Sequence, residues 1–322
     1  MKEQLLNLPK IELHLHLDGS ISYNLARQLT GKTIQELKQL MIAKDKCDNL
    51  SEYLTKFDFP CSLMQTKKNL KLIAKDLVDR LASQNVIYAE IRFAPMFHTK
   101  EGLTYEEIIE AVLDGLKSNT SIKTNLILCL MRGMPKEENL KTIDIAEKYL
   151  NRGVCAIDLA GDEDKYPLDE YLCLFEIAKL KNIPFTIHAG ENGDASEVKK
   201  AINIGAKRIG HGIHSIESQE VLDLIKEKNI LLEICPTSNV QTNSIDKYEN
   251  HPIEKLYKLD IPLCINTDNS TVSNITITEE YYKLSRYFNF NMDDYKQMNI
   301  NAINFSFLKE EEKEELLKYF KP

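Results

Sequence analysis

Short apolar segments alternate with amphipathic segments along most of the chain. Eight of the apolar segments have the length of β-strands, and most of them are rich in β-branched residues. These predicted strands are residues 11–17, 86–94, 125–131, 154–159, 185–189, 208–210, 230–235 and 262–266. Strands that alternate with helices over short connections pair in parallel, through right-handed crossovers. The pattern therefore predicts an α/β protein, a (β/α)8 barrel.

The segments between the predicted strands have the spacing of helices. Apolar residues recur every three or four positions from Leu70 to Leu81, which places one apolar stripe on a helix that faces the sheet. Thr33 and Thr104 are each followed three residues later by a glutamate, the capping box that begins a helix. Further helices are predicted at residues 168–180, 195–202, 218–228 and 253–259.

Two stretches depart from this repeat. Residues 19–85 form a long helical excursion between the first two strands, and such an excursion can roof the mouth of a barrel and act as a lid. Additional helices are expected after Thr278, where the acidic run at residues 310–315 is typical of a solvated helix face. No linker composition marks a second domain, so we expect residues 1–322 to form one domain.

The composition excludes several classes of protein. With 41 Lys and Arg against 49 Asp and Glu, the net charge is −8, the wrong sign for a chain that binds nucleic acid or an anionic membrane. The seven cysteines include no Cys-x-x-Cys pair. This pattern predicts free thiols in a reducing compartment. Because no signal-peptide core and no long apolar run is present, we expect a cytoplasmic protein with a small-molecule partner.

Histidines and a carboxylate stand at the ends of the predicted strands. His14 and His16 are two residues apart near the end of the first strand, so their side chains point to the same side. His188 ends the fifth strand, His211 follows the sixth, and Asp268 follows the eighth. The C-terminal ends of all strands of a (β/α)8 barrel converge on one face, which holds the active site. We therefore expect these side chains to meet in space.

Residues of these types suit a hydrolytic metal site. Three imidazoles and a carboxylate can bind Zn²⁺ and leave a position for water, and Glu191 lies close in sequence as a candidate acid. A zinc ion lowers the pKa of its bound water to about 7, which makes hydroxide available at neutral pH. A non-catalytic barrel that binds zinc or a purine stays open as an alternative, although such a binder needs neither the acid nor an open metal position.

Five motifs stand in a characteristic order along residues 8 to 275. They are IELHLHLDGS at 11–20, DLAGDE at 158–163, HAGE at 188–191, RIGHG at 208–212 and NTD at 266–268. Together they resemble the adenosine deaminase family of the metal-dependent amidohydrolases. The first and third motifs are distinctive individually, and the linked set is highly specific.

The resemblance implies a role for each matching residue. One Zn²⁺ ion would be bound by His14, His16, His188 and Asp268. Glu191 would protonate the purine ring nitrogen beside the attacked carbon, and His211 would orient the attacking water and help to move its proton. A single metal is expected because residues 154–161 contain no lysine of the kind that bridges two metals in related enzymes.

Four residues are implied as substrate contacts. Asp18 would bind a ribose hydroxyl, the backbone N–H of Gly161 would donate to a second ring nitrogen, and His16 would lie against the substrate as well as bind the metal. Asn269 stands where many family members carry a second aspartate. Because an amide donates a hydrogen bond at any pH, we expect Asn269 to contact the five-membered ring of the purine without a shifted pKa.

These residues predict a zinc aminohydrolase of purine salvage that converts adenosine, and 2′-deoxyadenosine, to inosine or its deoxy counterpart and ammonia. The alternatives are relatives that act on adenine, methylthioadenosine or an N6-substituted purine nucleotide. Asp18 argues against a free base, which has no ribose, and against a 5′-phosphate, which it would repel. The oligomeric state stays open.

Several other residues have less specific interpretations. His98 and His251 lie in predicted loops and are expected to be surface residues, whereas His214 is a candidate for the outer part of the site. Phe57 and Phe59 in the excursion could line a purine pocket or pack in the core, and the same alternatives apply to Leu63.

Overall fold

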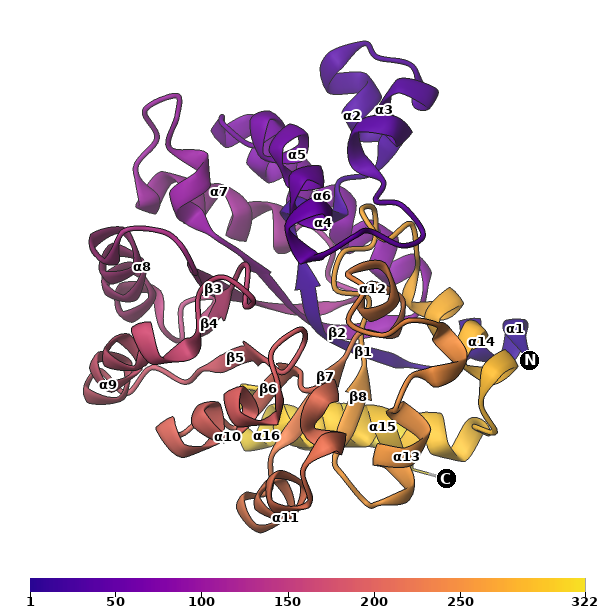
Figure 1. Ribbon diagram of the computed structural model, residues 1–322. Helices are drawn as coiled ribbons and strands as arrows, with labels where there is room; N and C mark the ends of the chain where they lie inside the picture. Colours follow the sequence, from indigo (N-terminus) through magenta and orange to yellow (C-terminus); the bar gives the residue numbers. More distant parts are fainter. Residues whose placement is uncertain (322) are drawn as a thin grey trace.

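The computed structural model describes residues 1–321 and contains eight strands, all paired in parallel with their neighbours (Figure 1). They are β1 (Lys10–His16), β2 (Val86–Phe93), β3 (Lys123–Met131), β4 (Val154–Ala160), β5 (Thr186–Ala189), β6 (Arg208–His211), β7 (Leu231–Ile234) and β8 (Leu263–Ile265). Each of the predicted strands is confirmed, with small differences at its ends. The strands are ordered β1-β2-β3-β4 in one sheet and β5-β6-β7-β8 in the other.

Backbone contacts connect the two sheets at both seams. Between β4 and β5, Ile157 pairs with Phe185. Between β8 and β1, the amide of His16 donates to the carbonyl of Asp268 at 2.7 Å, and the amide of Asp268 donates to the carbonyl of His14 at 3.0 Å. The strands therefore follow one another around a (β/α)8 barrel, as predicted. The second seam places Asp268 beside the two histidines of β1.

Helices lie outside the barrel, in the order expected from the sequence (Figure 1). Those that follow β2 to β7 are α7 (Tyr105–Leu116), α8 (Lys136–Tyr149), α9 (Leu172–Leu180), α10 (Ala195–Ile204), α11 (Gln219–Lys228), α12 (Pro236–Gln241) and α13 (Ile253–Lys258). Both predicted capping boxes form, because Thr33 and Thr104 each accept a hydrogen bond from the amide three residues later while the glutamate there bonds back to the threonine amide.

The excursion after β1 lies on the side of the barrel to which the strands point. It contains α2 (Tyr23–Thr30), α3 (Ile34–Met41), α4 (Leu50–Leu54), a 3-10 turn at Thr55–Phe57, α5 (Asp58–Leu63) and α6 (Lys67–Ser83). In Figure 1 the arrowhead of β1 points toward α4. The predicted apolar stripe from Leu70 to Leu81 forms the buried face of α6.

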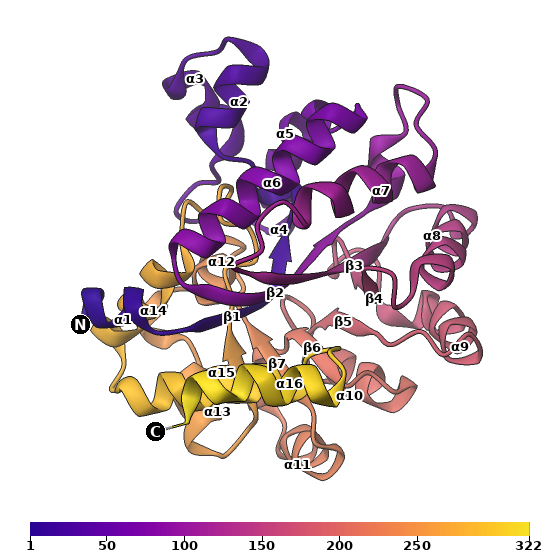
Figure 2. The same ribbon diagram turned by 180° about the vertical axis from the view of Figure 1, so that it is seen from behind.

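The opposite end of the barrel is covered by the C-terminal helices. These are α15 (Met292–Phe305) and α16 (Glu310–Leu317). They follow α14 (Ile277–Tyr287), which packs on β8 and on α1 (Lys2–Asn7). Figure 2 shows α15 and α16 next to each other near β7, and α15 contacts β1, β7 and β8. Ile11 and Leu231 from the strands share an apolar cluster with Ile303 and Leu316 from these helices. The C-terminal face, at the other end of the barrel, is not covered by these helices.

Two histidines that were expected at the surface are buried. His98 ends a 3-10 turn (Pro95–His98), where its ring lies 5.4 Å from the ring of Phe93, and His251 hydrogen-bonds the side chain of Asn239. Burial lowers the pKa of each imidazole to about 3. The prediction of surface positions is therefore wrong, because both loops fold over the C-terminal face of the barrel.

The cysteines are all free thiols, and only Cys173 is exposed. Cys129, Cys155 and Cys264 are buried within the strands, where they pack as small apolar side chains. None of the helices in residues 1–321 combines the length and the apolar character that crossing a membrane requires.

Candidate active site

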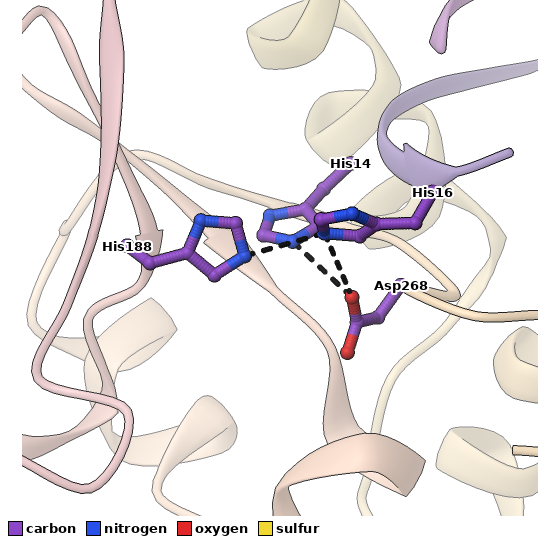
Figure 3. A group of neighbouring side chains, drawn as sticks. All are labelled: His14, His16, His188 and Asp268. Atoms are coloured by element: carbon purple, nitrogen blue, oxygen red, sulfur yellow. Dashed lines mark hydrogen bonds and ion pairs between the residues drawn. The ribbon is translucent and has the colours of Figure 1, made fainter. Parts of the chain in front are cut away.

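Four side chains from three places in the sequence converge at the C-terminal face of the barrel (Figure 3). His14 and His16 come from β1, His188 comes from β5, and Asp268 follows β8. Asp268 Oδ1 lies 3.4 Å from Nε2 of both His14 and His16, and His16 Nε2 lies 3.4 Å from His188 Nε2. One ligand atom from each of the four residues lies within 4.8 Å of the others.

The chemistry of this donor set fits a divalent metal ion. Three imidazole nitrogens and one carboxylate oxygen are typical zinc ligands. Within residues 1–321, Nε2 of His14 is buried without a hydrogen-bond partner, which an ion at this point would satisfy. Burial also holds the pKa of His16 well below its ordinary value. The ring is therefore neutral, the form that binds a metal.

Buried carboxylates orient two of these imidazoles from behind. Nδ1 of His14 lies 2.9 Å from Glu233, and Nδ1 of His188 lies 2.9 Å from Asp158. Arg92 joins the two carboxylates, at 2.8 Å to Glu233 and 2.9 Å to Asp158. With Nδ1 engaged in this way, each ring turns Nε2 toward the site.

Sequence patterns alone did not predict a role for Glu233, Arg92 or Asp158. A signal was present, because Glu233 is the one charged residue of the apolar strand β7, and Arg92 interrupts the apolar part of β2. A charged residue in a strand that is buried throughout needs a partner in the interior. Which partner it has depends on the closed barrel, because β2, β4 and β7 lie far apart in the sequence.

The loop after β5 presents the candidate acid. Backbone amides of Gly190, Glu191, Asn192 and Gly193 all donate to the Glu163 carboxylate, at 2.8 to 3.2 Å. Such a run of amides around one anion holds the loop in a single conformation. A side chain at position 193 would clash, since its Cβ would lie 2.7 Å from Glu163. Glu163 is thus a positioning residue that the sequence analysis quoted only as part of a motif.

Glu191 itself is buried beside His211, with Oε2 at 3.6 Å from Nε2 of the imidazole. Burial raises the pKa of its carboxyl well above the ordinary value, and the negative charges of Asp268 and Glu163 raise it further. A carboxyl in such surroundings keeps its proton near neutral pH, as a general acid must.

His211 is held from the other side by α12. Its Nδ1 lies 2.9 Å from the side-chain amide of Asn239, and burial lowers the pKa of its ring well below the ordinary value. On the same helix, Ser238 donates to Asp268 at 2.6 Å. Neither α12 residue was singled out from the sequence. His214 is not part of this group, because its ring pairs with Glu217 on the protein surface.

A cavity of about 490 Å³ opens beside these side chains. All the predicted site residues except His14 line it, and His14 lies behind the others, fully buried. The excursion supplies much of the remaining wall, including Tyr53, Leu54 and Phe57. Phe59 and Leu63, for which a pocket position had also been considered, pack against the core instead.

The predicted substrate-binding residues all face the cavity. Asp18 begins a 3-10 turn (Asp18–Ser20), and burial raises the pKa of its carboxyl to about 7. Gly161 follows β4 with φ +106°, a conformation that favours glycine. The amide of Asn269 donates to the Tyr53 hydroxyl at 3.2 Å, and its oxygen has no partner within residues 1–321.

Comparison with known proteins identifies the family. Residues 9–321 match the family model of adenosine deaminase. The chain belongs to the adenosine deaminase family. The adenosine deaminase of Clostridium botulinum is 43% identical over 324 residues, which cover 97% of this chain and 98% of the relative.

Solved structures of deaminases with other substrates in their names share the fold of this chain. The N6-methyl-AMP deaminase of Arabidopsis thaliana is 28% identical with a TM-score of 0.86, over 99% of this chain and 98% of that one. The adenine deaminase of Arthrobacter aurescens is 24% identical with a TM-score of 0.88, over 97% of this chain and 98% of that one. At that identity the likeness shows the fold alone.

Proposed function

We propose that this protein hydrolyses adenosine, and 2′-deoxyadenosine, to the corresponding inosine and ammonia in purine salvage. The observation that carries the proposal is the buried Glu191 carboxyl beside His211 in the same cavity as His16, His188 and Asp268. The likeness of nearly the whole chain to an adenosine deaminase supports the choice of substrate.

His14, His16, His188 and Asp268 would hold one Zn²⁺ ion, which when bound makes a water molecule acidic enough to supply hydroxide at neutral pH. The chain supplies the rest of the chemistry. Attack on the amino-bearing carbon breaks the aromaticity of the purine, so the ring nitrogen beside it must gain a proton. Glu191 donates that proton, and His211 orients the attacking water.

The remaining site residues bind the nucleoside. Asp18 accepts a hydrogen bond from a ribose hydroxyl, the N–H of Gly161 donates to a ring nitrogen, and Asn269 contacts the five-membered ring. His16 lies against the substrate as well as holding the metal. Residues 1–322 act as one domain, because the strands that carry these side chains come from both halves of the chain.

Charge in the cavity favours a neutral nucleoside over a nucleotide. Asp18, Asp58 and Asp162 also line the cavity. Of the two basic side chains in the lining, Arg132 is already engaged, at 2.6 Å to the carbonyl of Tyr166 and 2.7 Å to that of His188. Lys100 is the other cation, and Asp162 is paired with Lys165 at 3.1 Å, so Asp18 and Asp58 are the acidic groups that disfavour a 5′-phosphate.

Release of ammonia from adenosine by the zinc-loaded protein tests the proposal, with Glu191→Gln as the decisive variant. We expect kcat to fall by about 10²- to 10⁴-fold, the usual contribution of a general acid, with zinc content unchanged. Glu217→Gln is the control, since Glu217 is an exposed partner of His214 away from the cavity. Equal turnover by Glu191→Gln would contradict the mechanism.

A panel of adenosine, adenine, methylthioadenosine and N6-methyl-AMP distinguishes the rival functions. Adenosine should be the best substrate, and Asp18→Ala should slow turnover of adenosine more than that of adenine. A preference for another member of the panel would assign the protein to that substrate. No turnover of any member by zinc-loaded protein would favour a non-catalytic barrel.

A further inference from the structure

A buried chain of hydrogen bonds runs from the start of α13 to the end of β6. The amide of Ile253 donates to Nδ1 of His251 at 3.1 Å, and Nε2 of His251 lies 3.1 Å from Oδ1 of Asn239. The side-chain nitrogen of Asn239 then lies 2.9 Å from Nδ1 of His211. Asn239 and His211 are essentially inaccessible to solvent, and His251 is 3% exposed.

The direction of every hydrogen bond in this chain follows from its first member. A backbone N–H can only donate, so Nδ1 of His251 accepts and carries no proton. The neutral ring of His251 then has its proton on Nε2 and donates to the oxygen of Asn239. This contact turns the NH₂ group of Asn239 toward His211. Nδ1 of His211 must accept, so the proton of the neutral ring is on Nε2.

The opposite arrangement would place like groups against each other. With a proton on Nδ1 of His211, two N–H donors would meet at 2.9 Å. Rotation of the Asn239 amide would relieve that contact, but would turn the NH₂ group toward the Nε2–H of His251. Because these three side chains are buried, water cannot compensate for either mismatch. An unpaired buried donor costs about 1–3 kcal/mol.

The assigned proton points into the catalytic site. Nε2 of His211 has no hydrogen-bond partner within residues 1–321 and lies 3.6 Å from Oε2 of Glu191. The His211 ring also packs against the ring of His14, with centroids 4.9 Å apart. A donor at this position can contact an oxygen atom that approaches the substrate from the metal side, but cannot take a proton at the same atom.

We propose that Asn239 and His251 are positioning residues that hold His211 as its Nε2–H tautomer, so that His211 enters the reaction as a hydrogen-bond donor rather than as a base. This inference rests on the proposed function and deepens it. It gives His211 the role of orienting the attacking oxygen atom. The first proton acceptor is then another group of the site.

The tautomer can be measured directly in the zinc-loaded protein. Nitrogen-15 NMR of protein labelled at histidine, with the His211 signals assigned by their loss in His211→Gln, should show a proton bonded to Nε2 and a bare Nδ1. A proton on Nδ1 would overturn the proposal. Because this measurement needs no turnover, a protein with the expected tautomer but no activity on adenosine would contradict the proposed function alone.

Asn239→Asp tests whether this series of hydrogen bonds controls the reaction. A carboxylate can only accept, so it should draw the His211 proton to Nδ1 and reverse the hydrogen bond. We expect kcat for adenosine to fall by about 10- to 100-fold, the usual effect of losing the partner that orients a site imidazole, while KM changes little. If kcat fell while the NMR signals still showed Nε2–H, these hydrogen bonds would have a merely structural role and the proposal would be wrong.

Two further variants guard against a simple loss of folding. Asn299→Asp is the matched control, since Asn299 is equally buried, accepts from the amide of Ile11 and donates to the carbonyl of Tyr295, but lies on α15 at the other end of the barrel. It should leave kcat and the His211 signals unchanged. His251→Phe frees the Asn239 amide to rotate, so the NMR spectrum should show both tautomers of His211. A single unchanged Nε2–H tautomer would remove His251 from the proposal.

Discussion

At the scale of single residues, Asn269 shows how much the surroundings decide. Its side chain is buried next to Asp268, and its amide group already donates to the hydroxyl of Tyr53, which in turn contacts Ser273 at 2.7 Å. An aspartate here would be a fourth carboxyl group in an enclosed site that already contains Asp18, Glu191 and Asp268. An amide supplies the same shape with no charge to bury.

Asn269→Asp should therefore make activity dependent on pH. Burial and the nearby negative charge raise the pKa of the new carboxyl, which donates a hydrogen bond only below that pKa. We expect kcat/KM for adenosine to fall in the variant as pH rises through this value, with no matching step in the wild-type profile. Profiles of both proteins measured between about pH 5 and 9 provide the test. If the two coincide, the contact of Asn269 with the purine is doubtful.

At the scale of elements, the loops that follow β4 and β5 act as a pair. Glu163 belongs to the first loop and accepts hydrogen bonds from four successive amides of the second, which carries Glu191. The same carboxylate raises the pKa of Glu191 through its negative charge. One residue thus holds the conformation of the acid's loop and adds to the effect of burial and of Asp268 on the pKa of the acid.

Glu163→Gln should separate these two effects. The variant places an NH₂ group among backbone donors, so we expect the free energy of unfolding to fall by about 1–3 kcal/mol. Loss of the charge lowers the pKa of Glu191, and because its acid form exists only below that pKa, the alkaline limb of the kcat profile should move to lower pH. Denaturant unfolding and pH–rate profiles measure the two effects.

The control for this variant is Asp164→Asn, which removes a neighbouring charge that is exposed and contacts only the side chain of Asn192. Its effect on stability and on the alkaline limb should be small. A Glu163→Gln profile identical to wild type would show that the charge of Glu163 does not control the protonation of Glu191.

At the scale of the whole molecule, buried ion pairs connect the barrel strands beneath the site. Arg92 on β2 bonds Asp158 on β4 and Glu233 on β7, and Arg208 on β6 bonds Glu233 at 2.7 Å. His14 and His188 rest on the same two carboxylates. The orientation of the candidate metal ligands therefore depends on a network that forms only when the barrel closes.

Arg92→Met should damage stability and metal binding together. Removing the guanidinium leaves buried Asp158 without its arginine and Glu233 with Arg208 alone, so we expect a loss of about 3–5 kcal/mol in the free energy of unfolding. Zinc affinity should fall about 10- to 100-fold, because the carboxylates no longer hold the imidazoles in place. Denaturant unfolding of the zinc-free protein and calorimetric zinc titration measure these separately.

Arg286→Met is the surface control for this prediction. Arg286 is exposed on α14 and contacts only the hydroxyl of Tyr282, so its loss should change stability by less than about 1 kcal/mol. Unchanged zinc affinity in Arg92→Met would contradict the role of the network in orienting His14 and His188.

The sequence was sufficient to predict the strands and the convergence of their C-terminal ends. It was also sufficient to predict the candidate metal ligands, which are His14, His16, His188 and Asp268. Local periodicity predicts each strand, and the geometry of a parallel barrel brings the ends together whatever the loops contain. The burial of His98 and His251 could not be predicted in the same way. Loop residues carry no periodic pattern, and their exposure depends on what folds over them.

The candidate site residues and the type of barrel could thus be predicted from the order of residues alone. Tertiary structure decided the state of those residues. Glu233, Glu163 and Asn239 come from distant segments, and each sets the orientation, the charge or the tautomer of a site residue by direct contact. Arg92 acts through Glu233 and Asp158. Protonation depends on the local solvent and on neighbouring charges, and neither exists until the barrel has closed around them.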